Sequence, residues 1–511
     1  MILAIDQGTT ATTCIVFDER GEPIGRAQAE LSQSFPRPGW VEHNMDEIWE
    51  LVQGLAGQAL RDAGVAAQDV IAIGITNQRE TVCAWDVTTG RPLHSAIVWQ
   101  DRRTSERCAQ LRAQGLQPLV RQRTGLVLDP YFSATKMQWL LENVEGLAQK
   151  AKAGHALLGT VDSWLAFKLT GEHVTDPSNA ARTLLYDLAD GDWSEELLDL
   201  FGVPRRALPQ IRPSAGAIAT VRGDTLAGIS APLAGIAGDQ QAALFGQACV
   251  DPGMGKNTYG TGSFVLLHAG FSPPDPVDGL LSTVGWGIGQ TRSYALEASI
   301  FATGAAVQWL RDGLGIIAAA HESEALAASL AGNEGVYFVP ALTGLGSPHW
   351  DPDARGTIVG LTRGSGRAHL ARATLEAIAY QTVDAVRAME RACGQPLREL
   401  RADGGATTNR WLMQFQADIL GVPVLVPEIA ETTALGAALL AGVGVGAWSI
   451  SDVGAGWRER ARYEPSMSED ERQSLLAGWQ RALARTRSEG VEDAERAARV
   501  TYPAQRRRSI T

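Results

Sequence analysis

The sequence predicts an α/β protein of two large domains, and three observations support this prediction. The chain has 511 residues, which is more than one hydrophobic core accommodates. Its 55 glycines cluster around short apolar runs, as in α/β enzymes whose backbone approaches a ligand closely. A unit of strand, small-residue turn and strand occurs at residues 2–17 and again at 256–268. This weak internal repeat divides the chain near residue 247.

The first copy of the repeat opens the chain. Residues 2–5 and 14–17 are apolar runs that predict two strands, and residues 6–10 form the turn between them. The rest of this half predicts helices near residues 45–61 and 105–119, a strand near 70–76, and a buried strand at 233–237 followed by a helix from residue 242.

The second copy has its turn at residues 260–263 and its second strand at 264–267. From about residue 466 the chain is helical and highly charged, which we interpret as a surface appendage. Between this second hairpin and the charged segment, the sequence predicts a strand at 400–403, a turn at 404–405 and a helix at 409–420. We therefore expect three parts, an N-terminal domain, a C-terminal domain and a charged appendage, at residues 1–246, 247–465 and 466–511.

The charge balance argues against a nucleic-acid-binding protein. Lys and Arg total 45 and Asp and Glu total 57, which leaves a formal net charge of −12. A mildly acidic chain lacks the basic surface that binds phosphate backbones. The basic run Arg506-Arg507-Arg508 is typical of a solvated tail. We therefore expect no nucleic-acid partner.

The cysteines and the apolar runs indicate a cytoplasmic protein. There are five cysteines, an odd number without a C-x-x-C pair, which speaks against a disulfide framework and a zinc site and suits a reducing compartment. Residues 1–6 lack the basic segment of a signal peptide. The sequence contains no run long enough to span a bilayer, so we expect no integral membrane segment.

The turns of the two repeated units are suited to phosphate binding. They read Gly8-Thr9-Thr10 and Gly260-Thr261-Gly262. Glycine lets backbone N–H groups point at an anion, and threonine hydroxyls add donors. One such turn alone is more often an ordinary hairpin turn. Two of them, one in each half, favour phosphate binding.

Two acidic residues follow or end apolar strands. Asp6 lies beside the first turn, where its carboxylate could hold Mg²⁺ through water, or could instead only shape the turn. Asp239 lies between a strongly apolar strand and a helix. It could cap that helix, or it could accept a proton from a substrate hydroxyl if it faces the phosphate turns.

Arg79 and Glu80 follow the strand near residues 70–76. A guanidinium donates hydrogen bonds and a carboxylate accepts them, so the pair could bind a polyol. The alternative is a surface ion pair, which is common and only weakly stabilising.

Two longer segments carry a resemblance to a known family. Residues 131–140 and the stretch from Gly356 to Glu376 resemble the two signatures of the FGGY carbohydrate kinases. The similarity covers nearly the whole chain and is weakest after residue 466. Within the family the chain is most similar to the glycerol kinases, on four strings at residues 77–80, 97–100, 238–247 and 256–262.

The resemblance implies a fold, a reaction and a set of roles. The fold would be two actin-like domains of the ribonuclease H-like and hexokinase type around a central cleft. The reaction would be the transfer of a phosphoryl group from ATP to glycerol, giving ADP and sn-glycerol 3-phosphate in glycerol catabolism. The enzyme would use Mg²⁺ and form a homo-oligomer, a dimer or a tetramer.

The same resemblance assigns individual residues. Asp239 would be the catalytic base, Phe264 would cover the carbon face of glycerol, and Asp6 would help place Mg²⁺. Glycerol would be held by Arg79, Glu80, Tyr131, Asp239 and Gln240. The nucleotide would be contacted by Thr9, Thr10, Ala11, Thr13, Thr261, Gly304, Gln308, Gly405 and Asn409.

Two other functions are considered. Another member of the family could phosphorylate a pentulose or a related polyol, although the Arg79–Glu80 pair and the bulky Phe264 favour a three-carbon substrate. A non-catalytic ATP-binding or chaperone-like protein of the same fold is the second alternative, and Asp239 argues against it because binding alone requires no base.

The chain departs from the family pattern at two places. The first hairpin of the family usually carries an arginine where this chain has Thr13. Bacterial glycerol kinases of the family are often inhibited by fructose 1,6-bisphosphate, bound by a glycine-rich loop with an arginine. The corresponding loop here, residues 222–232, has Ser230 at the arginine position and Asp224 nearby.

Overall fold

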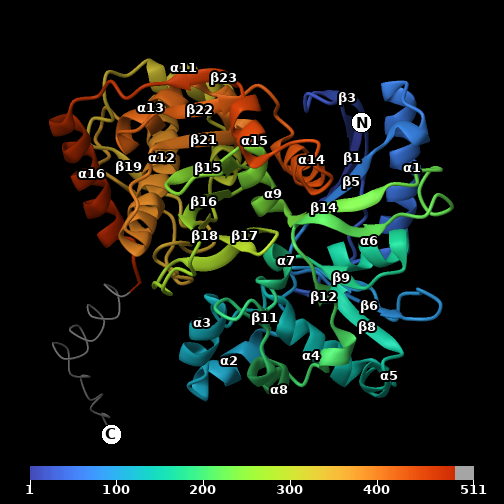
Figure 1. Ribbon diagram of the computed structural model, residues 1–511. Helices are drawn as coiled ribbons and strands as arrows, with labels where there is room; N and C mark the ends of the chain where they lie inside the picture. The colour runs from blue at the N-terminus through green and yellow to red at the C-terminus, as the bar shows by residue number, and fades with distance from the viewer. Residues whose placement is uncertain (489–511) are drawn as a thin grey trace, which may run out of the picture.

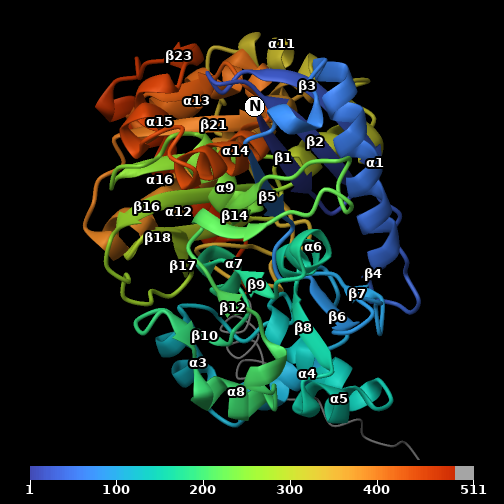
Figure 2. The ribbon, with the colours of Figure 1, turned by 45° about the vertical axis from the view of Figure 1, so that its right-hand side comes forward.

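The computed structural model describes residues 1–488. Within this range a 13-stranded sheet runs through both halves of the chain (Figures 1 and 2). Its strands, in spatial order, are β23 (Glu459–Tyr463), β22 (Val424–Pro427), β21 (Glu399–Gly404), β15 (Met254–Tyr259), β16 (Ser263–Gly270), β18 (Thr291–Ile300), β17 (Leu281–Ile288), β13 (Ala215–Thr220), β14 (Pro232–Gly238), β5 (Ala72–Asn77), β1 (Ile2–Gln7), β2 (Ala11–Phe17) and β3 (Pro23–Glu30).

The two halves of this sheet repeat one strand order. In the first half the spatial order is β3-β2-β1-β5-β14, and in the second it is β18-β16-β15-β21-β22. In the first half, β3, β2 and β1 pair antiparallel, and β5 and β14 continue the sheet in parallel with β1. In the second half, β18, β16 and β15 pair antiparallel, and β21 and β22 continue the sheet in parallel with β15. The internal repeat predicted from the two hairpins therefore extends to five strands in each half of the sheet.

Smaller elements complete the first half. A four-stranded sheet has the order β4 (Glu42–His43), β7 (Ala96–Ile97), β6 (Val82–Asp86) and β8 (Ala156–Thr160). Short pairs are β9 (Val174–Thr175) with β12 (Gln210–Ile211), and β10 (Tyr186–Asp187) with β11 (Asp192–Trp193). The helices are α1 (Met45–Ala63), α2 (Ser105–Ala113), α3 (Gln117–Thr124), α4 (Ser133–Asn143), α5 (Leu147–Ala153), α6 (Val161–Thr170), α7 (Pro177–Ala180), α8 (Glu195–Phe201) and α9 (Asp239–Gly246).

The second half is mainly helical outside the large sheet. A short pair joins β19 (Tyr337–Val339) and β20 (Thr357–Val359). The helices are α10 (Gly304–Gln308), α11 (Glu322–Ala328), α12 (Arg367–Cys393), α13 (Arg410–Leu420), α14 (Thr432–Gly444), α15 (Ile450–Gly456) and α16 (Glu469–Ala484).

Strand β1 is buried on both faces because its residues alternate between two cores. Leu3 and Ile5 pack with residues of α1, whereas Ile2 and Ala4 pack with alanines of α14. The two sequence halves are thus interleaved, since α14 belongs to the second half of the chain yet lies on the sheet of the first half (Figure 2).

Glycines allow α14 to approach this closely. A Cβ atom at Gly74 of β5 would lie 2.2 Å from the carbonyl oxygen of Ala437, and one at Gly436 would lie 1.8 Å from that of Ala242 in α9. Both distances are far below van der Waals contact, so neither position accepts a side chain without moving the backbone. The close packing fixes α9, and with it the first residue of α9, against the sheet.

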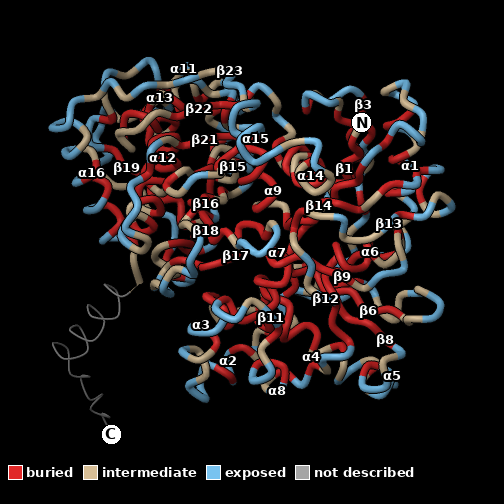
Figure 3. The backbone as a smooth tube through the Cα atoms, in the orientation of Figure 1, coloured by how far each residue is buried: buried red, intermediate tan, exposed pale blue. Residues whose placement is uncertain are grey.

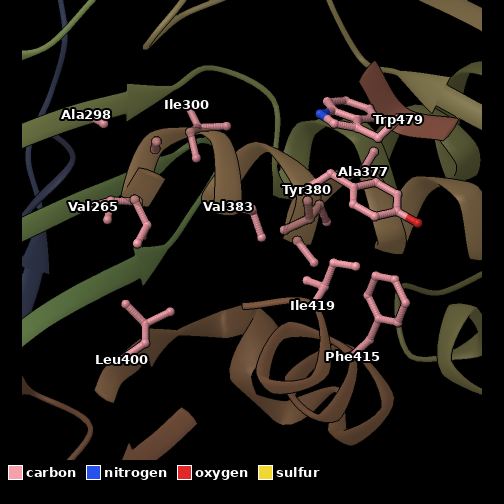
Figure 4. Close-up of a cluster of buried hydrophobic side chains, with 14 of the residues drawn as sticks. Val265, Ala298, Ile300, Ala377, Tyr380, Val383, Leu400, Phe415, Ile419 and Trp479 are labelled. Atoms are coloured by element: carbon pink, nitrogen blue, oxygen red, sulfur yellow. The ribbon is translucent and has the colours of Figure 1, made fainter. Parts of the chain in front are cut away.

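The core of the second half is shown in Figure 4. It joins strands β16, β18 and β21 to helices α12, α13 and α16, and Figure 3 shows the same region as buried backbone. Trp479 of α16 stacks on Tyr380 of α12 with ring centroids 5.2 Å apart. Trp479 also donates a hydrogen bond of 2.7 Å to Asp384.

Most of the predicted elements are present, and two differ from expectation. The segment 105–119 forms two helices, because Gly115, with φ of 76°, lies between α2 and α3. The charged segment after residue 466 does form a helix, α16, but one face of that helix is buried in the core. The basic run at 506–508 lies outside the described residues.

The five cysteines are free thiols, and four of them are buried. In the described part of the chain, none of the helices is long and apolar enough to cross a bilayer.

Candidate active site

The predicted catalytic residues meet at the carboxyl ends of three parallel strands. Asp6 on β1 and Ala237 on β14 both pair with Thr76 on the central strand β5. Arg79 and Glu80 lie in the turn after β5, separated from it by Gln78, and Asp239 begins α9 directly after β14. Because β1, β5 and β14 are parallel and similar in length, these polar side chains lie together at the carboxyl edge of the sheet, where ligands bind in open α/β sheets.

The turn that carries Glu80 has an unusual backbone. Glu80 has a positive φ of 58°, a conformation that costs a non-glycine residue of order 1–3 kcal/mol. The turn is held by Thr81, which donates a backbone hydrogen bond to Arg79 and a side-chain hydrogen bond to Gln78. Ser133 of α4 donates to the Glu80 carbonyl oxygen at 3.1 Å. These contacts fix Arg79 and Glu80 in space.

Arg79 and Glu80 do not form a surface ion pair, since their side chains are each 2% exposed. The Arg79 Nε atom lies 3.1 Å from Asp239 Oδ1. Its two terminal nitrogens bind Glu297 of β18 at 2.5 and 3.2 Å. Arg182 binds Glu80 at 2.7 Å and Glu297 at 3.0 Å. Two arginines and two glutamates thus form a closed ring of alternating charge, and Asp239 attaches to it through Arg79.

The ion pairs of the ring keep Glu297 and Arg79 charged, although burial alone would favour their neutral forms. Burial acts to raise the pKa of Glu297, but Arg182 and Arg79 outweigh it and hold that pKa at about 2. The pKa of Arg79 stays above its ordinary value despite burial, chiefly because of Glu297. Glu297 and Arg79 are therefore charged at neutral pH, whereas burial raises the pKa of Glu80 above its ordinary value despite the opposing charges of Arg79 and Arg182.

Aromatic side chains surround this polar cluster. The Tyr131 hydroxyl accepts a hydrogen bond of 3.4 Å from Arg79, and the Phe264 ring centroid lies 6.0 Å from the Arg79 guanidinium carbon. Trp99 packs edge-on against Tyr131 with centroids 5.5 Å apart, and its Nε1 donates to Thr9 Oγ1 at 2.8 Å. Rings beside hydrogen-bonding groups suit a ligand with a carbon face and several hydroxyls.

Gln240 is oriented by a buried lysine. The Lys256 ammonium donates hydrogen bonds to the Gln240 side-chain oxygen and, at 2.8 Å, to Thr258 Oγ1. An ammonium cannot accept a hydrogen bond, so the Gln240 amide presents its NH₂ group away from Lys256. Burial lowers the pKa of Lys256 to about 8.

The second phosphate-type turn meets the start of α10. The N–H groups of Gly304 and Ala305 donate to the carbonyl oxygens of Gly260 and Thr261, each at 3.0 Å. A Cβ atom at Gly304 would lie 2.7 Å from the Gly260 oxygen, which explains why glycine stands there. Thr261 remains exposed, so its hydroxyl is accessible to a ligand.

The remaining nucleotide-site residues lie around these turns. Gly405 is exposed. It follows Gly404, which pairs with Tyr259, the residue just before the second turn. Gln308 is exposed at the end of α10. Asn409 caps α13 through the Leu412 N–H at 2.9 Å, and its own amide reaches Ser323 at 3.5 Å.

In the first hairpin, Thr10 is exposed, Ala11 is half-buried and Thr13 is buried. Thr13 pairs directly with Asp6 across the hairpin, so the two side chains share one face of the sheet.

Asp6 lies in an acidic environment. Burial, with repulsion from Asp239 and Glu431, raises the pKa of Asp6 to about 7. A divalent cation near Asp6 and Asp239 would offset this repulsion, and carboxylate oxygens are the ligands that Mg²⁺ takes in proteins. Asp6 and Asp239 would supply only part of a Mg²⁺ ligand set, since the described residues contain no group of three or more His, Cys, Asp or Glu side chains placed to hold a metal ion.

Sequence reasoning missed four polar or aromatic residues of the site. Trp99 and Lys256 stand inside the strings at 97–100 and 256–262 but were given no role. Arg182 and Glu297 belong to no motif. The available signal for Glu297 was a single acid within the apolar strand segment 294–300, because a charge in such a strand requires a partner.

Comparisons with known proteins agree with this geometry. The FGGY family of carbohydrate kinases matches through its N-terminal domain at residues 1–246 and its C-terminal domain at residues 255–445. A protein named glycerol kinase from Dechloromonas aromatica (strain RCB) is 55% identical over 488 residues, which are 95% of this chain and 97% of the relative.

Solved structures share the fold. The crystal structure of Plasmodium falciparum glycerol kinase with ADP has a TM-score of 0.91 and 36% identity, and the match covers 95% of this chain and 98% of that one. The crystal structure of xylulose kinase from Rhodospirillum rubrum has a TM-score of 0.85 and 26% identity, with 95% and 98% covered. The two-domain α/β fold predicted from the sequence is confirmed, and the chain belongs to the FGGY family of carbohydrate kinases.

Proposed function

We propose that this chain catalyses the ATP-dependent phosphorylation of glycerol to sn-glycerol 3-phosphate. The observation that carries the proposal is the contact of Arg79 Nε with Asp239 at 3.1 Å, which attaches the partly exposed Asp239 carboxylate to the buried ring of two arginines and two glutamates. This arrangement places a carboxylate beside a set of hydroxyl-binding groups. The relatives named glycerol kinase, at 52–55% identity over nearly all of the chain, support glycerol as the acceptor.

In this proposal Asp239 accepts the proton of the attacking hydroxyl. Arg79 and Glu80 bind the other hydroxyls, and Phe264 covers the carbon chain. Phosphoryl transfer depends on positioning and on charge neutralisation more than on covalent chemistry by the protein. Mg²⁺, when bound, would supply part of that neutralisation, with Asp6 helping to hold it.

The nucleotide is proposed to lie between the two repeated turns. Thr9, Thr10 and Ala11 on the first hairpin and Thr261 on the second would contact the phosphates. The residues of the second half, Gly304, Gln308, Gly405 and Asn409, would line the rest of the site. We further propose a cytoplasmic homo-oligomer with domains at 1–246 and 247–465.

The main alternative is phosphorylation of a pentulose, since xylulose kinases share the fold. We expect glycerol to be preferred because the rings of Tyr131 and Phe264 lie beside Arg79, and Trp99 packs against Tyr131, so aromatic groups would restrict the room for a longer acceptor. Initial rates of ADP release with glycerol, xylulose and ribulose at equal concentrations test this. A pentulose with a higher kcat/KM than glycerol would contradict the proposal.

Replacing Thr13 by arginine is expected to tighten nucleotide binding. Thr13 shares its sheet face with Asp6 beside the first phosphate turn, so an arginine there would bring a guanidinium near the phosphates. Calorimetric titration of ADP into Thr13→Arg and the unchanged protein measures the effect. Equal or weaker binding would count against this placement of the phosphates.

Fructose 1,6-bisphosphate is expected to leave the activity unchanged. In loop 222–232, Ser230 cannot provide the bidentate donors that arginine gives to a phosphate. Asp224 adds a repelling charge, and the exposed Arg222 lies on the far side of it. Titration of the bisphosphate at saturating ATP tests this. Saturable inhibition at sub-millimolar effector, persisting in Arg222→Ala, would show that another surface binds it.

A further inference from the structure

Glu297 occupies a place where a carboxylate is costly. It lies in the middle of β18, among buried apolar residues of the segment 294–300, and its side chain is 0% exposed. A buried charge is tolerated only when it is paired and hydrogen-bonded. The role of Glu297 should therefore follow from the groups with which it forms ion pairs.

Both Glu297 oxygens are engaged by arginines. Oε2 accepts from Arg79 Nη1 at 2.5 Å, and Oε1 accepts from Arg79 Nη2 at 3.2 Å. Oε1 also accepts from Arg182 Nη2 at 3.0 Å. The two-point contact with Arg79 fixes the plane of that guanidinium, which a single contact would leave free to rotate.

Glu297 leaves one nitrogen of Arg79 and two nitrogens of Arg182 uncontacted, and in each arginine the Nε atom contacts another acid, while the buried Nη1 of Arg182 has no hydrogen-bond partner among the described residues. Arg79 Nε points to Asp239 at 3.1 Å, and Arg182 Nε donates to Glu80 at 2.7 Å. Glu297 is therefore the carboxylate shared by two arginines, one of which orients Asp239 and the other Glu80. Glu297 comes from the second half of the chain, whereas its partners all come from residues 1–246.

We propose that Glu297 is a positioning residue that sets the orientation of Arg79 and Glu80 toward the polyol. The proposal rests on the proposed function, since it concerns the same acceptor site. Without the Glu297 charge, both arginines would compete for Glu80 and Asp239. Those two carboxylates would then be less available to hydroxyl groups, so the acceptor site would lose affinity and selectivity.

The test uses Glu297→Gln and Glu297→Asp in the full-length protein. For Glu297→Gln we expect the KM for glycerol to rise by on the order of 10²-fold, with the KM for ATP changed by less than about threefold. The kcat/KM preference for glycerol over propane-1,2-diol and propane-1,3-diol should fall by about tenfold or more. Glu297→Asp keeps the charge and should recover part of both effects.

Glu376→Gln is a matched control. Glu376 is also buried in the second half, where it pairs with Arg372 at 2.7 Å and accepts from Asn333 and Tyr380. Neutralising it should lower the melting temperature as much as Glu297→Gln does, while the glycerol KM and the diol preference stay unchanged. This comparison separates positioning from general loss of stability.

Three results would overturn the proposal. One is a Glu297→Gln enzyme whose glycerol KM and diol preference match those of the unchanged protein. The second is a rise in the KM for ATP as large as the rise for glycerol, and the third is the appearance of the same changes in Glu376→Gln, since either would indicate a structural role. Failure of the proposed function is distinguished because the unchanged protein would then not phosphorylate glycerol at all.

Discussion

Replacing Asp239 by asparagine is expected to reduce kcat for glycerol phosphorylation by about 10²–10⁴-fold, the usual contribution of a general base. Asparagine keeps the shape of the side chain and can still contact Arg79, but it cannot take a proton. Glycerol affinity, measured by calorimetry in the presence of a non-hydrolysable ATP analogue, should therefore stay within a few-fold of the unchanged protein.

The control for this variant is Asp187→Asn. Asp187 is a buried aspartate with an arginine partner, Arg123 at 3.3 Å, and it accepts backbone hydrogen bonds in the loop after β10. It lies outside the site, so its neutralisation should leave kcat unchanged. An Asp239→Asn enzyme that turns over within about tenfold of the unchanged protein, a difference of about 1.4 kcal/mol, would contradict the assignment of the base.

Removal of Glu80 or Arg79 is expected to raise the KM for glycerol strongly. Each side chain is buried and paired, so Glu80→Ala leaves Arg182 without its 2.7 Å partner, and Arg79→Met leaves Glu297 and Asp239 facing each other. Breaking a buried pair costs about 3–5 kcal/mol, which corresponds to about 10²–10³-fold in affinity if most of the cost falls on the acceptor site.

Steady-state kinetics with varied glycerol and with varied ATP separate the two sites. The KM for ATP should change much less than the KM for glycerol, because the two turns that we propose contact the nucleotide do not contain Glu80 or Arg79. If Glu80→Ala left the glycerol KM unchanged, the polyol would have to bind elsewhere. Circular dichroism and the melting temperature of each variant establish that the protein is folded.

Part of the site could be predicted because it follows from local pattern. Asp6, Arg79, Glu80 and Asp239 each end or follow an apolar strand. The structure pairs β1, β5 and β14 in parallel, which brings these ends to one edge of the sheet, whereas the sequence pattern predicted the strands but not their pairing. The repeated hairpin likewise predicted an internal repeat, and each of the two hairpins belongs to a set of five strands with the same order.

The rest of the site depends on contacts between distant residues. Glu297 lies 218 positions from Arg79 and 115 from Arg182, and a single sequence does not specify such pairings. The same reason applies to α16, whose charged composition suggested a peripheral helix. Its Trp479 reaches Tyr380 on α12, and only the tertiary packing shows that this aromatic residue has a partner.

The most direct test of the proposed function is identification of the product. The purified protein is incubated with ATP, Mg²⁺ and glycerol, and the product is oxidised by a dehydrogenase specific for sn-glycerol 3-phosphate while ADP release is followed in parallel. We predict glycerol-dependent ADP release matched one to one by sn-glycerol 3-phosphate. ADP release that does not depend on glycerol, or no sn-glycerol 3-phosphate in the presence of all three reactants, would contradict the account.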